Sequence, residues 1–149
     1  MDEDLFWQLI AQLDWAKLGD DEAVCAPVVV ALAARPEAAI HGFEEILAQK
    51  LFALDTEAHA RQTGENAYVG PEEYFSVDAF LYARCCVVAN GQEFYERVRR
   101  DPTQMPADVD FEALLGIAGA AFEARTGGEL EFTPSVSYET FANAAGWPR

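Results

Sequence analysis

The amino-acid sequence predicts an all-α fold: a compact single domain of about five helices with an irregular carboxyl-terminal tail. Three observations predict it. Apolar residues recur at three- and four-residue intervals over long stretches of the chain. Aspartate, serine, proline and glycine stand where these stretches begin and end, as they do at helix termini. Finally, 149 residues of which 51% are hydrophobic suffice for one core. We expect a helical domain over residues 1–128 and a tail over 129–149 packed on it.

The first two helices are predicted over residues 4–17 and 22–34, the second with an aspartate as its amino-terminal cap. Pro27 leaves one question open, because a proline inside a helix removes a hydrogen bond and kinks it. Either the second helix is kinked, or it begins near Cys25 and places Pro27 in its first turn. A strand over residues 28–30 is a weaker alternative.

A long third helix is predicted from Pro36 to about His59, since proline is well tolerated at the start of a helix. The apolar residues that mark it are Ile40, Phe43, Leu47, Leu51, Leu54 and Ala58. Residues 62–75, which are rich in glycine, are expected to form a connector. We allow one short helical turn at residues 71–74.

The fourth helix is predicted to start at Ser76 or Asp78, either of which can cap it, and to run to about Arg100. The following Asp101 and Pro102 would stop it. Gly91 lies in its apolar sector, where the absence of a side chain would let another helix approach closely.

The fifth helix is predicted to begin after Asp108 or Asp110 and to end at Thr126, before a Gly-Gly pair of the kind that terminates helices. We expect the tail to pack on the helices, with one helical turn at residues 138–144. Four aromatic residues are its predicted anchors, namely Phe132, Tyr138, Phe141 and Trp147.

The net charge of −16 argues strongly against a nucleic-acid ligand, because a phosphate backbone is bound through cations. Solvated carboxylates alone would explain the charge as an aid to solubility, and they could also attract a basic protein. No apolar run reaches the length of a membrane span, and the amino terminus is acidic where a signal peptide is basic. We expect a cytoplasmic protein without membrane contact.

Arg84 is the most informative single residue, because the helical projection places it in the middle of an apolar sector. A buried guanidinium needs a partner, and Asp55 and Glu44 of the third predicted helix are the candidates, with Asp55 preferred. Two roles stay open. Arg84 is either clamped by a carboxylate that sets helix register, which we expect, or it binds an anion in a pocket.

Other chemistry finds little support in the sequence. Asp55 and His59 stand four residues apart, the spacing of a helical metal-ligand pair, but two ligands do not make a site and His41 lies too far along the same helix. The serines lack a glycine-flanked elbow, and no phosphate loop or dinucleotide fingerprint occurs. We therefore expect neither a metal nor a cofactor.

One stretch of the sequence is similar to a known family. Its residues are Ser76-Val77-Asp78-Ala79-Phe80-Leu81-Tyr82-Ala83-Arg84, followed by Gly91, Tyr95 and Asp101-Pro102, together with Phe6-Trp7-Gln8-Leu9-Ile10 near the amino terminus. The chain resembles, over roughly residues 1–105, the bacterial family called domain of unknown function 4240. It departs from the commoner pattern around Asp55, where members often carry tryptophans, and at Ala79, where glycine is frequent.

The resemblance implies an α-helical bacterial domain with no assigned activity, and it singles out Asp78, Tyr82 and Arg84. In the helical projection Asp78 and Tyr82 point away from Arg84, so the three cannot line one pocket on this helix alone.

Two functional hypotheses follow. The first is a soluble acidic binding or regulatory module that engages a basic protein partner. The alternative is a small-molecule or anion-binding protein, or an enzyme, with a pocket around Asp55, His59, Tyr82 and Arg84. The sequence leaves open whether the protein is an enzyme, although the missing catalytic motifs favour a binding protein.

Overall fold

The computed structural model describes residues 1–148 and confirms the all-α fold, with no strand in that part of the chain. Residues 1–148 form seven α-helices where five were predicted, because two of the predicted helices are each divided in two. The α-helices are α1 (Glu3–Ile10), α2 (Asp21–Ala33), α3 (Glu37–Ala53), α4 (Glu57–Ala60), α5 (Val77–Ala89), α6 (Gln92–Arg100) and α7 (Ile117–Thr126). Short 3-10 helices are η1 (Trp15–Lys17), η2 (Gly64–Asn66), η3 (Pro102–Gln104), η4 (Glu112–Gly116) and η5 (Ala144–Gly146).

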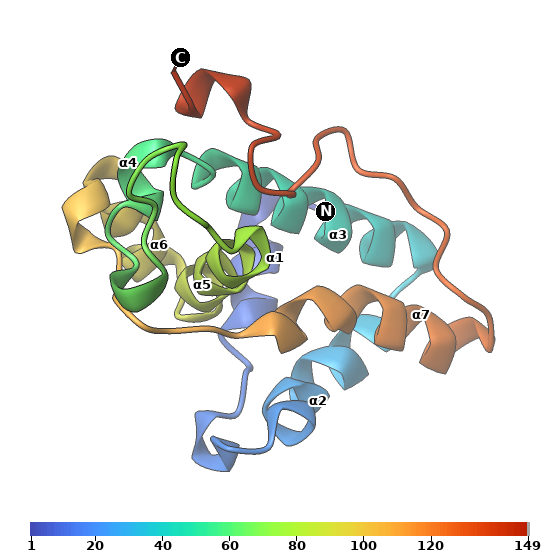
Figure 1. Ribbon diagram of the computed structural model, residues 1–149. Coiled ribbons are helices and arrows are strands. Elements are labelled where there is room, and N and C mark those ends of the chain that lie inside the picture. The colour runs from blue at the N-terminus through green and yellow to red at the C-terminus, as the bar shows by residue number, and fades with distance from the viewer. Residues whose placement is uncertain (149) are drawn as a thin grey trace.

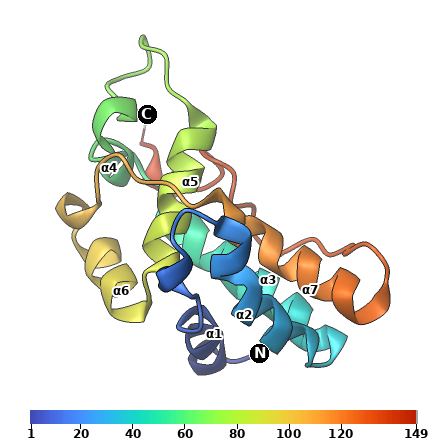
Figure 2. The same ribbon diagram turned by 90° about the horizontal axis from the view of Figure 1, so that it is seen from below.

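The helices pack around one core. Helix α7 contacts both α2 and α3, while α5 contacts α3, α6 and η4 (Figures 1 and 2). Phe43 and Leu47 of α3, Leu32 of α2 and Val87 of α5 are completely buried in this core. After α7 the tail turns back and runs over α3 toward α4 (Figure 1). No helix in residues 1–148 has the length and apolar character that crossing a membrane requires.

The first predicted helix is too long, since α1 ends at Ile10. Asp14 starts a separate 3-10 turn by accepting a hydrogen bond from the backbone N–H of Ala16, and its own N–H donates to the carbonyl of Val24. Pro27 lies inside α2, which begins after its cap, Asp20. The start near Cys25 is therefore wrong.

The third predicted helix is divided after Ala53, where α3 ends, and α4 begins at Glu57. Thr56 takes an extended conformation, and its hydroxyl oxygen accepts a hydrogen bond from the backbone N–H of His59 as the cap of α4. The break removes Asp55 and His59 from a common helical face and turns Asp55 toward the tail.

The fourth predicted helix is divided at Gly91, which has φ +100° and joins α5 to α6. Side-chain-bearing residues rarely adopt this conformation, so glycine is the residue that allows the chain to change direction here. No atom lies within 4 Å of the place a side chain would take. The prediction that Gly91 lets another helix approach is therefore wrong.

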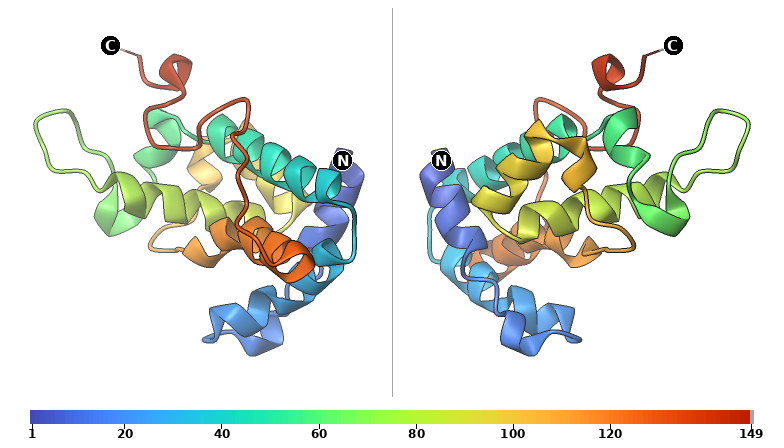
Figure 3. Two further views of the ribbon diagram at one scale, coloured as in Figure 1. Left: turned by 90° about the vertical axis from the view of Figure 1, so that its right-hand side faces the viewer. Right: turned by 90° about the vertical axis from the view of Figure 1, so that its left-hand side faces the viewer.

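The remaining predictions are partly confirmed. Helix α7 ends at Thr126 with Gly127 in the left-handed conformation, as predicted, but it starts only at Ile117, after the 3-10 helix η4. Residues 71–74 form a turn and a bend rather than a helical turn, in a loop that projects from the body of the molecule (Figure 3). The helical turn predicted at residues 138–144 is absent, and η5 follows instead.

Candidate functional site

Arg84 lies in the core with no exposed surface, as its place on the apolar face of α5 predicts. Its Nη1 donates to the carbonyls of Leu51 at 2.9 Å and Tyr138 at 3.0 Å, and its Nη2 donates to Thr140 Oγ1 at 2.9 Å. The guanidinium also lies over the ring of Phe80, 4.6 Å from its centre. Burial lowers the pKa of Arg84 to about 10, which still leaves it charged at neutral pH.

Asp55 is also completely buried, but it does not form the predicted ion pair with Arg84. No carboxylate of residues 1–148 lies within 4.0 Å of the Arg84 guanidinium. Asp55 instead accepts three hydrogen bonds from the tail: from the backbone N–H groups of Phe141 at 3.1 Å and Asn143 at 2.9 Å, and from Trp147 Nε1 at 2.8 Å. The predicted carboxylate clamp on Arg84 is therefore wrong: two groups of the tail and one backbone carbonyl of α3 hold the guanidinium instead.

His59 is buried and structural. Its Nε2 lies 2.8 Å from the carbonyl of Val98, which can only accept, so this nitrogen carries the proton. The other ring nitrogen, Nδ1, lies 2.7 Å from the hydroxyl of Thr56 and accepts its hydrogen. Burial lowers the pKa of His59, which keeps the ring neutral and fixes α4 against α6.

The remaining pattern residues lie apart from Arg84, as the helical projection predicts. Tyr82 is half-buried and lines a hollow of about 250 Å³ with Asp108 and Asp110, while Asp78 is exposed in the first turn of α5. Of the four residues proposed for a pocket, Asp55, His59 and Arg84 are buried in the core, and the hollow that Tyr82 lines includes none of them. These four residues therefore do not come together at one accessible surface.

Glu44 of α3 has a different environment from the one proposed for it. It lines a hollow of about 770 Å³ between α3, α7 and the start of the tail, far enough from Arg84 that the two form no bond. Its side chain is only 8% exposed, yet it has no hydrogen-bond or ion-pair partner among residues 1–148. Burial raises the pKa of Glu44, because the charged carboxylate is poorly solvated there.

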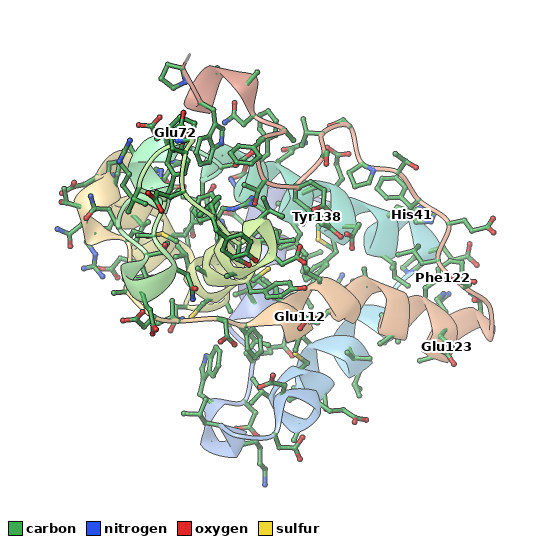
Figure 4. All side chains as sticks on the ribbon, viewed as in Figure 1. His41, Glu72, Glu112, Phe122, Glu123 and Tyr138 are labelled. Atoms are coloured by element: carbon green, nitrogen blue, oxygen red, sulfur yellow. The ribbon has the colours of Figure 1, made fainter. Side chains whose placement is uncertain are left out.

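Two further carboxylates, Glu123 of α7 and Glu129 of the tail, line the same space, which we call the acidic hollow. Its α7 wall is made of small residues, including Gly119 and Ala120, and the tail contributes Phe132. Phe132 stacks on His41 of α3 with ring centres 4.9 Å apart. Figure 4 labels His41, Phe122 and Glu123 in this region, with Tyr138 further along the tail. Chemically, the acidic hollow is suited to a cation with an apolar stem.

The tail is held in place by a second glutamate that the sequence did not single out. Glu45, next to Glu44 on α3, accepts hydrogen bonds from the backbone N–H of Ser135 at 2.7 Å and from its hydroxyl. Among the predicted anchors, Trp147 is buried, Phe132 and Tyr138 are half-buried, and Phe141 remains 42% exposed. A pair of glutamates inside an apolar helical stripe is the sequence feature that could have indicated this region.

The environments of the three cysteines disfavour the thiolate form. Burial raises the pKa of Cys25 to about 11 and that of Cys85 to about 12, and it also raises the pKa of Cys86. All three are free thiols. A thiol with a raised pKa stays protonated and unreactive, which agrees with a packing role.

Fold and site together define a class: an all-helical domain in which a buried arginine and a buried aspartate hold the chain's own tail over an acidic hollow. The chain belongs to the family described as "Protein of unknown function (DUF4240)", whose model matches residues 1–124. The pattern of residues 76–84 indicates the same family. The match ends within α7, so the tail that completes the hollow lies beyond it. No curated protein and no solved structure matches the chain.

Proposed function

We propose that this protein is a binding module for a basic protein partner, and that the acidic hollow receives a lysine side chain of that partner. The observation that carries the proposal is Glu44, a residue only 8% exposed that lines the hollow and whose carboxylate has no hydrogen-bond or ion-pair partner among residues 1–148. A buried charge that no group of the protein compensates is costly to the fold. An ammonium group entering the hollow would supply the missing partner.

The walls of the hollow favour lysine over a compact metal ion. A lysine has a four-carbon stem that packs on apolar surface while its charged end seeks a polar group. Leu115 and Leu130 supply apolar surface, and the small residues of α7 leave room for the stem. Glu123 and Glu129 are exposed and add negative charge around the buried carboxylate.

The charge of the whole chain supports the same partner class. A net charge of −16 attracts a basic surface from a distance and speeds its encounter, an effect that salt weakens. A buried contact between ammonium and carboxylate is screened much less. Binding should therefore weaken as salt rises, and affinity that does not depend on salt would contradict the proposal.

The test uses hexalysine as the probe, with fully acetylated hexalysine as its uncharged counterpart, in calorimetric titrations of the full chain. Glu44→Gln should weaken hexalysine binding by about tenfold or more, the effect of losing one charge-assisted hydrogen bond. Glu93→Gln, an exposed residue of α6, changes the net charge equally and should alter the affinity less than about twofold. Equal losses in both variants, or binding of the acetylated peptide, would overturn the proposal.

A further inference from the structure

A second hollow, separate from the acidic one, lies between α4, the loop that precedes α5 and the end of the tail. Its volume is about 600 Å³, and four aromatic side chains line it: Tyr68, Phe75, Phe141 and Trp147. We call it the aromatic groove. Neighbouring rings meet at steep angles, with Tyr68 at 88° and Phe141 at 68° to Trp147, and ring centres 5.1 and 4.6 Å apart. Trp147 is buried at the base of this cluster and Tyr68 and Phe75 are half-buried, so Phe141 contributes most of the accessible aromatic surface.

The fold holds one of these rings toward solvent. Phe141 is 42% exposed and has φ +77°, a conformation that is unfavourable for a residue with a side chain. Its backbone N–H donates to the buried Asp55, and Trp147 Nε1 donates to the same oxygen atom. Backbone strain of this kind persists where the surrounding structure enforces it and is concentrated at binding sites. Asp55 therefore sets the positions of two rings of the groove.

The rim of the groove carries both signs of charge. Arg61 donates through Nε to Glu57 at 2.9 Å, and its guanidinium lies over Tyr68, 5.2 Å from the ring centre. Its other N–H groups have no hydrogen bond within residues 1–148. The exposed Glu73, on the loop that precedes α5, also lines the groove.

We propose that the aromatic groove binds an extended, proline-rich segment of a partner protein that carries a basic residue. Proline rings pack well on aromatic faces, and a polyproline II segment is already ordered before it binds. Prolines lack N–H groups, so such a segment offers carbonyl acceptors, which the free N–H groups of Arg61 can meet. The basic residue finds its counter-charge in Glu73 or Glu57.

Exposed apolar and aromatic side chains continue beyond the aromatic groove onto the loop that precedes α5. Tyr74 is 90% exposed and Val69 62% exposed on the projecting loop, where two large side chains gain nothing for the fold (Figure 3). Exposed tyrosine and nearby arginine are typical of the residues that contribute most at protein interfaces. The groove is lined by none of the residues that line the acidic hollow, so the two sites can be tested independently.

The experiment titrates the full chain with a ten-residue peptide that contains two proline pairs and one arginine, followed by tryptophan fluorescence and by amide chemical shifts. Matched peptides replace the prolines by alanine or the arginine by alanine. Phe141→Ala should weaken binding by about tenfold. Val30→Ala, which trims a 69% exposed apolar residue of α2, should leave it unchanged, and so should Glu44→Gln.

Several outcomes would overturn the inference. The first is that the proline peptide does not bind, and the second is that the alanine peptide binds equally well. The third is that Phe141→Ala binds like the wild type. Glu73→Gln serves as a second variant on an exposed loop position, where folding is not at risk, and should weaken binding of the arginine peptide by about threefold. If it leaves that affinity unchanged, the assigned role of Glu73 is wrong.

Discussion

Arg84 and Asp55 are both completely buried, and each binds the same tail instead of the other. Arg84 donates to the carbonyl of Tyr138 and the hydroxyl of Thr140, while Asp55 accepts from the backbone N–H of Phe141 one residue further on. The cation thus binds acceptors of the tail and the anion binds its donors. Backbone groups, with the side chains of Thr140 and Trp147, partner both charges and offset part of the cost of burying them, while Arg84 Nε has no partner among residues 1–148.

Arg84→Met keeps much of the side-chain volume but removes every hydrogen bond of the guanidinium. We expect it to lower the free energy of unfolding by about 3 kcal/mol, because the carbonyls of Leu51 and Tyr138 lose their buried donor. Urea unfolding followed by circular dichroism measures the change. Amide exchange of Phe141 should also become faster. An unchanged unfolding midpoint would show that the tail is held without Arg84.

Asp55→Asn keeps the shape of the side chain but leaves one oxygen for three tail donors. We expect a loss of about 1–3 kcal/mol in the free energy of unfolding and a red shift of tryptophan emission, because Trp147 loses its acceptor. Asp78→Asn is the matched control, since Asp78 is exposed in the first turn of α5 and should cost little. A loss no larger than that of the control would contradict the role assigned to Asp55.

Glu44→Gln should stabilise the protein at neutral pH while it weakens binding of hexalysine. Burial raises the pKa of Glu44 above the ordinary 4.5, so the folded chain holds this proton more tightly than the unfolded chain. The contribution of Glu44 to the stability of the wild type therefore rises as the pH falls through the raised pKa toward 4.5. The advantage of the variant should be largest at pH 7 and disappear near pH 4.5. Thermal unfolding across this range measures it, and a variant less stable than the wild type at pH 7 would contradict the prediction.

Gly91→Ala and Gly119→Ala form a matched pair, because neither new methyl group meets an atom within 4 Å. At Gly91 the φ of +100° makes alanine unfavourable, and we expect a loss of about 2 kcal/mol in the free energy of unfolding. At Gly119, inside α7, alanine has the better helix propensity and should add about 0.5–1 kcal/mol. Chemical denaturation measures both. Equal effects would mean that the backbone of Gly91 is not decisive.

Helix breaks mark the limit of what periodicity predicts. The apolar spacing continues without interruption through Leu54 and through Gly91, because the segments on both sides of each break bury their apolar residues in the same core. Short-range patterns therefore merged α3 with α4 and α5 with α6. A single residue marks each break: Thr56, which caps α4, and Gly91, whose backbone takes a positive φ.

The candidate sites show the same limit more strongly. The sequence points to Glu44 only as a possible partner of Arg84. Its hollow depends on Glu123, Glu129 and Phe132, which lie 79 or more residues away in the chain. The aromatic groove joins Tyr68 to Trp147. A pattern of neighbouring residues cannot predict contacts between residues so far apart in the sequence.

The sequence by itself determined the helical class, the end of α7 at Thr126, the family and the burial of Arg84, because these depend on spacing within a few turns of one helix. Only the tertiary structure decided the partner of each buried charge. Arg84 and Asp55 were expected to bind each other, since opposite charges are the simplest pair. The tail offers both of them backbone groups at short distance, and these bonds join residues 54 to 88 positions apart.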